Sequence, residues 1–540
     1  MAEQVPVLIV GGGPVGLMLG LELGSRGVPA LVIDESLATP VPRANLIAAR
    51  SMEYFRRLGF ADEVRAAGLP ADYPHDTAYR TTFTGEELYR VPVPSAAAVR
   101  DGAVSEADWP TPEPQHRINQ MYVEQILAEQ VQRFPSLTVE RGVRLLSLEQ
   151  GDGLVRAEVE EVETGARRTI EAQWLVGCDG TRSTVRRQVG LRYVGVDKIL
   201  QVVSVYFRSR ELLGLGERPA WMTFTFNPHH VGAVTAIDGE ELWVSHHHFP
   251  PTVDPSQFEP RELLEQTLGR SIDFETVAVI PWRAKAMVAE HYRSERVFLA
   301  GDAAHDWVPA AGFGMNAGLG DAVDLGWKLA AVLNGWGGDG LLDAYEAERR
   351  SLGDTVSRAL GAVGGSLFTL EPRMRVDEPG EAGERAREEL REGIPMAENG
   401  FHHAVGLNFG FQYSSPIVVS DGSEPAQFSI AAYDPDGRPG RRLPHLRLAD
   451  GTPLFDHLGP ELTLLRIGAD APVAAALLEA AAVRGVPLIE LLVPDASEAR
   501  ALFGARLLLV RPDQHIAWRG DELPADALAL IDQVRGAGGG

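Results

Sequence analysis

The stretch Gly11-Gly12-Gly13-Pro14-Val15-Gly16 decides the first part of this fold. It follows the strand-like run 5–10 and opens an apolar helical pattern. Glycine at Gly11, Gly13 and Gly16 lets the backbone turn tightly and approach a pyrophosphate, and the helix N-terminus then offers it unpaired N–H groups. Pro14 suits the first helical turn, where its missing N–H costs nothing.

A second strand, 30–33, ends at Asp34 and is followed by Glu35. This spacing places a carboxylate where it can accept hydrogen bonds from a ribose. Strand, glycine turn, helix, strand and acid together predict a βαβ unit that binds a dinucleotide, against the alternative of a purely structural glycine turn.

Two further motifs each combine a buried strand with a carboxylate at its C-terminal end. The first is 176–186, with Asp179-Gly180, and the second is 297–305, with Gly301-Asp302. Pro309 and the glycine-rich segment Gly312 to Asn316 come next and open another helix, whose N–H groups can face an anionic or electron-rich ring edge. Ligands collect at such strand ends in open α/β sheets, although either aspartate can also simply cap a turn.

In this order and spacing, the three motifs resemble the class A FAD-dependent aromatic hydroxylases, the group of para-hydroxybenzoate hydroxylase and phenol hydroxylase. The resemblance covers about residues 5 to 350 and implies bound FAD. Arg43 and Gln120 match positions that this family places near the flavin, although Arg43 is alternatively a surface charge and Gln120 a helix cap. The implied FAD-binding residues are Gly11, Gly13, Pro14, Val15, Gly16, Asp34, Glu35, Arg43, Gln120, Asp179, Asp302, Pro309, Gly312, Gly314, Met315 and Asn316.

The pattern of elements predicts an α/β protein built from several domains. A Rossmann-like FAD domain of the GR2 type is expected at 1–72, 115–196 and 283–370, interleaved with a substrate-binding β-sheet domain at 73–114 and 197–282. A helical linker at 371–399 leads to a domain at 400–534 that resembles the thioredoxin-like domain of phenol hydroxylase. Residues 535–540 are expected to form a disordered tail.

Cys178 is the only cysteine, so the C-terminal domain has no Cys-x-x-Cys and no thiol–disulfide chemistry. A structural or dimer-forming role is expected for that domain, in a monomer or a homodimer. One cysteine also excludes an intrachain disulfide and suits a cytoplasmic protein. The net charge of −25 argues against nucleic-acid binding, and no stretch approaches the ~20 apolar residues that span a bilayer.

The substrate is expected between the flavin and the β-sheet domain. Its candidate contacts are Trp221, Phe224, Phe226, Val234, His246, His248 and Pro309. His246 or His248 can contact the substrate or deprotonate a phenol, or can simply be packed. The run His246-His247-His248 is not expected to bind a metal, because neighbouring strand residues point to opposite faces.

The resemblance implies a monooxygenase that hydroxylates a phenolic or polycyclic aromatic compound. In this family NADPH or NADH reduces FAD, and O2 then adds to the flavin as a C4a-hydroperoxide that attacks the ring. Only one Gly-x-Gly-x-x-Gly, at 11–16, directly follows a strand-like run, so NAD(P)H is expected to bind only transiently. A Baeyer–Villiger or oxidative-rearrangement enzyme acting on an aromatic polyketide is one alternative, and a non-catalytic flavoprotein that binds an aromatic ligand is another.

Overall fold

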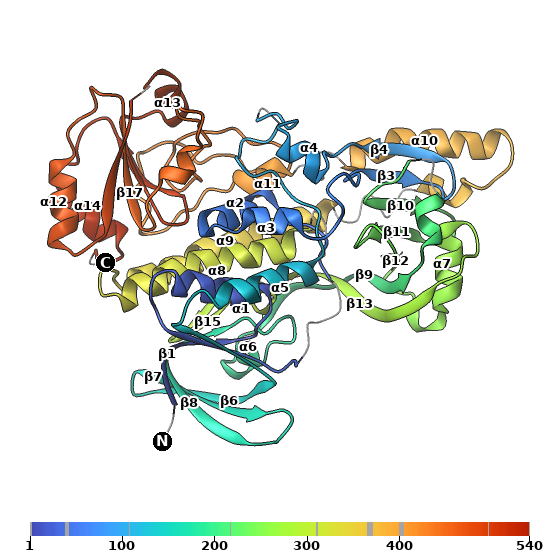
Figure 1. Cartoon of the computed structure of the whole chain (residues 1–540), viewed down its shortest axis with the longest axis horizontal. Coiled ribbons are helices and arrows are strands. Elements are labelled where there is room, and N and C mark those ends of the chain that lie inside the picture. Colours follow the sequence, from blue (N-terminus) through green and yellow to red (C-terminus); the bar gives the residue numbers. More distant parts are fainter. Residues whose placement is uncertain are drawn as a thin grey trace.

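The computed structural model of the chain describes residues 3–37, 43–106, 108–215, 218–308, 312–363, 371–398, 404–494 and 496–538. These residues form three sheets (Figure 1). One sheet belongs to the N-terminal dinucleotide-type unit, one extends to the side of it, and one lies in the C-terminal region. Helices α8 (Phe313–Leu333) and α9 (Gly340–Val363) run between the first and third of these.

The first sheet has the strand order β14-β15-β8-β1-β2-β5, with the hairpin β6–β7 attached to β8. Strands β15, β8, β1, β2 and β5 run parallel. The strands are β1 (Glu3–Val10), β2 (Ala30–Asp34), β5 (Leu137–Arg141), β6 (Val143–Gly151), β7 (Leu154–Glu161), β8 (Arg167–Gly177), β14 (Arg293–Ser294) and β15 (Val297–Leu299). Strands β2 and β15 and the C-terminal parts of β1 and β8 read as apolar runs because both of their faces are buried.

Helices α1 (Pro14–Gly24) and α5 (Gln120–Val131) pack with α8 over one side of this sheet (Figure 1). The shorter helices of this unit are α2 (Ala49–Leu58), α3 (Ala61–Ala66), α4 (Ala96–Arg100) and α6 (Thr184–Gln188). Strands β15, β8 and β1 are parallel neighbours, so the three sequence motifs at their C-terminal ends lie at the same edge of the sheet, as predicted.

The second sheet has the order β16-β13-β9-β12-β11-β10-β3-β4 and is antiparallel except for the β10–β3 pair. Its strands are β3 (Thr77–Arg80), β4 (Glu87–Val91), β9 (Tyr193–Arg208), β10 (Met222–Phe226), β11 (Val231–Ala236), β12 (Leu242–Phe249), β13 (Glu275–Ala289) and β16 (His305–Trp307). Helix α7 (Pro260–Leu268) covers one face, and α10 (Glu381–Glu398) packs near β4. The domain boundaries predicted at 196/197 and 282/283 fall inside the continuous strands β9 and β13, which join the two units.

The third sheet has the order β18-β17-β19-β20, with β17 parallel to β18 and antiparallel to β19. This strand order is compatible with the thioredoxin-like domain expected from the sequence. Its elements are β17 (Leu462–Ile467), α12 (Ala475–Val483), β18 (Leu488–Val493), α13 (Ala496–Phe503), β19 (Leu507–Val510), β20 (Ile516–Gly520) and α14 (Ala527–Val534). A short helix, α11 (Val405–Phe409), precedes it.

The chain end corrects one expectation. Residues 535–538 are ordered against the turn before α9, where the Gly338 N–H donates to the Arg535 carbonyl and the Gly340 N–H to the Gly536 carbonyl. The prediction of a disordered tail is therefore wrong for these residues, because backbone hydrogen bonds hold them to the FAD-binding unit. None of the described helices is both long and apolar enough to cross a bilayer.

Candidate active site

The first glycine motif forms a turn that only glycine can make. Gly11 has a φ of +110°, and a Cβ there would lie 2.3 Å from the Cys178 carbonyl oxygen. A Cβ on Gly16 would lie 1.9 Å from the Gly11 carbonyl oxygen. At Gly13, in contrast, an added Cβ would meet nothing within 4 Å, and no side chain caps the helix that starts at Pro14. The turn is thus closed on the protein side and open where a phosphate would bind.

Asp34 is already tied to the backbone at the end of β2. Its Oδ2 accepts the Gly12 N–H at 2.6 Å and its Oδ1 accepts the Ser36 N–H at 2.7 Å. A ribose hydroxyl would have to share these oxygens, each of which has a further lone pair. Glu35 is exposed and lies 3.7 Å from Arg144, so only Asp34 belongs to the turn itself.

The second motif places Asp179 at the end of β8, beside the glycine turn. Its Oδ2 accepts the N–H groups of Thr184 and Val185 at 2.7 and 3.0 Å, which caps α6. Its Oδ1 is buried and has no hydrogen-bond partner among the described residues, and burial raises the pKa of this carboxyl group. Asp179 therefore caps a turn, as the alternative interpretation has it, and also keeps one oxygen for a ligand.

The third motif brings Asp302 and Arg43 together. Burial and then the neighbouring Asp306 raise the pKa of Asp302, while Arg43 is close enough to lower it. Arg43 is exposed, so its guanidinium can also reach a ligand between the two residues. Gln120 lies next to Arg43: its backbone N–H donates to the Ala44 carbonyl at 2.7 Å, and its side chain donates to Glu124 at 2.6 Å.

The segment that opens α8 contributes a second uncapped helix start. Gly312 has a φ of +61°, and a Cβ on Gly314 would meet nothing within 4 Å. Met315 is half-buried. The Asn316 side chain is fully used: its amide donates to the carbonyls of Leu46 and Gly312, and its oxygen accepts the Ala48 N–H. Pro309 lies outside the described residues.

These features fit FAD. Two uncapped helix starts, at Pro14 and Phe313, offer N–H groups to electron-rich oxygens, and the open space at Gly13, Gly180 and Gly314 leaves room beside the backbone. Val15 packs against Gly301 on the inner side of this edge, so it supports the turn from behind.

Strand register decides which face of the second sheet turns to this edge. Ser204 in β9 lies opposite His246 in β12, which lies opposite Ala233 in β11, which lies opposite Phe224 in β10. Directly paired residues share a face, so His246 and Phe224 lie on one face, and His248 and Phe226, two residues further on, share it. Tyr79 of β3 continues the row and stacks on Phe224, with ring centroids 5.3 Å apart.

Two of the candidate substrate contacts lie elsewhere. Val234 pairs with Ser245 on the opposite face and packs in the apolar cluster under α7. Trp221 belongs to the same cluster, with the Arg117 guanidinium 4.1 Å from its ring centroid. Phe226 is fully buried beside Tyr79. This leaves His246, His248 and Phe224 on the face opposite α7, next to Tyr206. Burial raises the pKa of Tyr206 to about 12, although the Arg43 charge opposes this rise.

Hydrogen bonds and ion pairs around Asp321, which the sequence did not predict, hold the third motif in place. One Asp321 oxygen accepts the Gly301 N–H and contacts His305 Nε2, both at 2.9 Å, and the other accepts Arg349 Nε at 2.6 Å. Arg349 also donates to the Tyr413 hydroxyl at 2.7 Å. Asp321 is visible in the motif, 19 positions after Asp302, but its partners come from distant parts of the chain.

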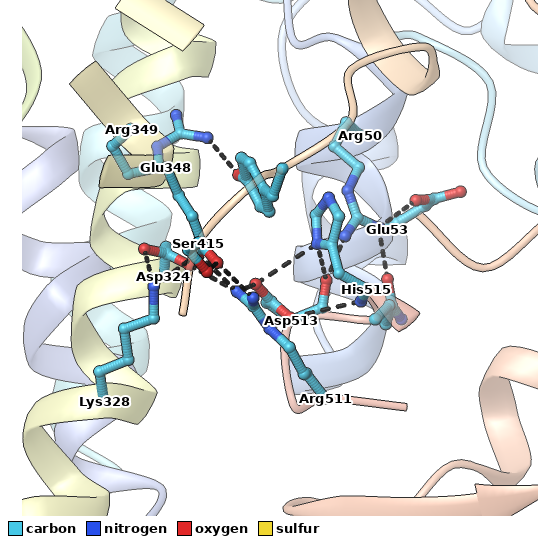
Figure 2. Close-up of polar contacts among 12 residues, drawn as sticks. Arg50, Glu53, Asp324, Lys328, Glu348, Arg349, Ser415, Arg511, Asp513 and His515 are labelled. Carbon is cyan, nitrogen blue, oxygen red and sulfur yellow. Dashed lines mark hydrogen bonds and ion pairs between the residues drawn. The ribbon is translucent and has the colours of Figure 1, made fainter. Parts of the chain in front are cut away.

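Charged side chains buried between α2, α8, α9 and the loop after β19 extend this centre (Figure 2). Arg511 donates to both carboxylate oxygens of Glu348 and to Asp324 and Asp513. Lys328 donates to Asp324 and Glu348. Arg50 and Arg442 pair with Glu53 nearby. Each of these cations contacts a carboxylate, so the cluster joins the domains without an unpaired charge.

Comparison with known proteins identifies the class. The FAD binding domain family matches residues 4–359, and the family of the C-terminal domain of aromatic-ring hydroxylases matches residues 436–536. Aklavinone 12-hydroxylase RdmE of Streptomyces purpurascens is 32% identical, over 98% of both chains. The FAD-dependent monooxygenase apdD of Emericella nidulans is 30% identical, over 98% of this chain and 90% of that one.

Solved structures agree with this class. The rebeccamycin biosynthetic enzyme RebC with reduced flavin superposes with a TM-score of 0.88, at 36% identity over 99% of this chain and 100% of that one. The flavin-dependent monooxygenase PieE in complex with FAD and substrate has a TM-score of 0.86, at 28% identity over 99% and 98%. The chain belongs to the FAD-binding aromatic-ring hydroxylase family. It is an FAD-dependent monooxygenase, and the expectations for fold class, cofactor and reaction class are confirmed.

Proposed function

We propose that this monooxygenase adds one oxygen atom to a fused polycyclic aromatic substrate that lies between the flavin and the sheet face carrying His246. The observation that carries the proposal is the composition of this face. Apolar and aromatic side chains surround a few polar groups, which is the pattern of a site for a flat apolar ligand. The side chains that share this face are those of Val202, Ser204, Tyr206, Phe224, Val231, Ala233, Val244, His246, His248, Ile280 and Trp282.

The position of this face supports the same conclusion. Trp282 packs against an apolar cluster that includes Trp307, Val308 and Phe313, the residues that flank the start of α8. Val244 and Tyr206 pack against Met121 and Tyr122, directly after Gln120. A ligand on the sheet face would thus lie beside the flavin-binding segments. Related structures with bound organic ligands add support: one is RebC with bound 7-carboxy-K252c, and another is aklavinone-11 hydroxylase with FAD and aklavinone.

When bound, FAD takes up two electrons from NADPH or NADH and activates O2 for the transfer of one oxygen atom. The chain's own residues bind the cofactor and orient the substrate. In our proposal the α1 start holds the pyrophosphate, Asp34 the ribose, and Asp179 and Asp302 the linking hydroxyl groups. Arg43, Gln120 and the segment at 312–316 flank the ring system. The apolar sheet face excludes water from the reacting centre.

Product analysis tests the proposal. Purified protein loaded with FAD would be supplied with NADPH or NADH, 18O2 and a panel of hydroxylated naphthalenes, anthraquinones and related fused rings. We expect one 18O atom in a ring-hydroxylated product. If fragmentation shows a lactone, the outcome is a Baeyer–Villiger oxidation. NAD(P)H oxidation that yields only hydrogen peroxide with every fused-ring compound would contradict the proposal.

We also propose that the chain acts in the cytoplasm as a monomer or homodimer, without binding nucleic acid or membranes. The net charge of −25 supports the absence of an extended surface for nucleic acid or anionic membranes, because such partners would be repelled. Light scattering of the purified holoenzyme gives the oligomeric state, and a species larger than a dimer would contradict the proposal.

A further inference from the structure

Three side chains on adjacent strands of the second sheet form a hydrogen-bonded chain. The Trp282 Nε1–H of β13 donates to Ser204 Oγ of β9 at 2.8 Å. Ser204 Oγ lies 2.7 Å from His246 Nδ1 of β12. Register explains the arrangement, because Ser204 is directly opposite His246 in the β9–β12 pair and all three side chains share the face opposite α7.

The chemistry of these groups places the protons. An indole N–H can only donate, so Ser204 Oγ accepts from Trp282. Among the described residues the Ser204 hydroxyl has no acceptor other than His246 Nδ1, so its own hydrogen points there. Nδ1 is then the acceptor of a neutral imidazole, and the ring carries its hydrogen on Nε2. Burial, and then the nearby His248, lower the pKa of His246 to about 3, which keeps the ring neutral at physiological pH.

The Nε2–H of His246 has no partner in the described part of the chain. The imidazole is half-buried, and its Nε2 is not enclosed by the protein. On the opposite face, His247 differs, because its ring is fully buried and its Nε2 is enclosed. Trp282, at the other end of the hydrogen-bonded chain, packs against the apolar cluster of Trp307 and Phe313 that borders the α8 start. The free donor therefore lies on the sheet face next to the proposed flavin position.

We propose that His246 donates a hydrogen bond from Nε2 to an oxygen of the aromatic substrate, either an ionised phenol or a ring carbonyl. The assignment rests on the proposed function, since it places the substrate on this face. Ser204 and Trp282 act as positioning residues that hold the tautomer. The alternative role of a phenol-deprotonating base is excluded for this tautomer, because a nitrogen that already carries hydrogen cannot accept a proton. His246 instead stabilises negative charge on the substrate oxygen, which favours the electron-rich form of the ring.

Nitrogen NMR tests the tautomer directly. The FAD-loaded protein would be labelled with 15N-histidine, and the His246 signals assigned by their loss in His246→Gln. We expect His246 Nε2 to be protonated and His246 Nδ1 to be unprotonated between pH 6 and 8. Ser204→Ala should introduce the other tautomer, whereas the matched control Ser245→Ala, on the next strand but on the opposite face, should not. An Nδ1-protonated ring in the unaltered protein, or an unchanged tautomer in Ser204→Ala, would overturn the assignment.

Ligand binding tests the donor. The dissociation constants of 1-naphthol, of its methyl isostere 1-methylnaphthalene and of 1,4-naphthoquinone would be measured by perturbation of the flavin absorbance. His246→Phe should weaken binding of one or both oxygen-bearing ligands roughly tenfold and leave the isostere within about twofold. The naphthol and quinone results separate an ionised phenol from a carbonyl. Equal weakening of all three ligands would refute the donor role. A protein that passes these tests but forms no oxygenated product would refute the proposed function alone.

Discussion

Replacement of Arg511 by Met tests the buried charge cluster that joins the C-terminal domain to α8 and α9. The Arg511 side chain is fully buried, and it donates to Glu348 through Nη1 at 2.6 Å and through Nη2 at 2.8 Å. Met has a similar length but no charge. In the variant, Glu348, Asp324 and Asp513 would therefore have only Lys328 and more distant cations to balance their charges.

Two arguments give the magnitude. Arg511 and Lys328 lower the pKa of Glu348 from its ordinary 4.5 to about 2, against the opposing effect of burial. A pKa lower by about 2.5 corresponds to roughly 3 kcal/mol of stability at neutral pH, since one pKa unit is about 1.4 kcal/mol. Removal of one partner from a buried ion pair independently costs about 3–5 kcal/mol. We therefore expect Arg511→Met to lower the free energy of unfolding by about 3–5 kcal/mol at pH 7.

The pH dependence has a defined sign. In the unaltered protein the depressed Glu348 pKa contributes stability that is complete above about pH 4.5 and is lost as the pH falls toward 2. In the variant, burial without Arg511 raises the folded-state pKa values of the carboxyl groups. Folding then takes up protons, so the stability of the variant falls as the pH rises from 5.5 to 8.

Urea unfolding at pH 5.5 and pH 8, followed by tryptophan fluorescence, measures both effects. Arg484→Met is the matched control, because Arg484 pairs with Asp532 at a partly exposed site in the same domain and should change the free energy of unfolding far less than Arg511→Met. If Arg511→Met stays within about 1 kcal/mol of the unaltered protein at both pH values, the cluster does not hold the domains together in the way described.

Three other predictions concern the glycine turn after β1, Asp302 after β15, and the contact between Arg117 and Trp221. Gly13→Ala should weaken FAD binding, because its Cβ would enter only the open space, and should leave the melting temperature of the FAD-free protein unchanged. Gly16→Ala should also lower the melting temperature of the FAD-free protein, since its Cβ would lie 1.9 Å from the Gly11 carbonyl oxygen; equal melting temperatures would contradict this. Asp302→Ala should lower FAD affinity, measured by flavin fluorescence, with an unchanged circular dichroism spectrum, and an unaltered FAD dissociation constant would exclude Asp302 from the site. Arg117→Met should raise the free energy of unfolding by ~1–3 kcal/mol in urea titrations, because two buried Arg117 nitrogens have no partner among the described residues; a loss of stability would show that the contact with Trp221 matters more.

The sequence by itself determined the cofactor edge. Gly11 and Gly16 are required by backbone geometry within one turn, and Asp34 follows at the end of the next strand, so local spacing was sufficient to predict a βαβ dinucleotide unit. Asp179 and Asp302 were also found because each ends a short apolar strand of a parallel sheet. The same reasoning located the strands of the second sheet, from alternation and β-branched residues.

Only the tertiary structure decided which side chains share the proposed substrate face. Val234 and His246 are equally good candidates in the sequence, and strand register alone sends them to opposite faces, since a shift of one residue exchanges the faces. The Trp282–Ser204–His246 chain joins residues up to 78 positions apart. The Asp321–Arg349–Tyr413 contacts likewise link the third motif to a distant segment. Such side chains carry no local signal, because their neighbours are set by the packing of whole domains.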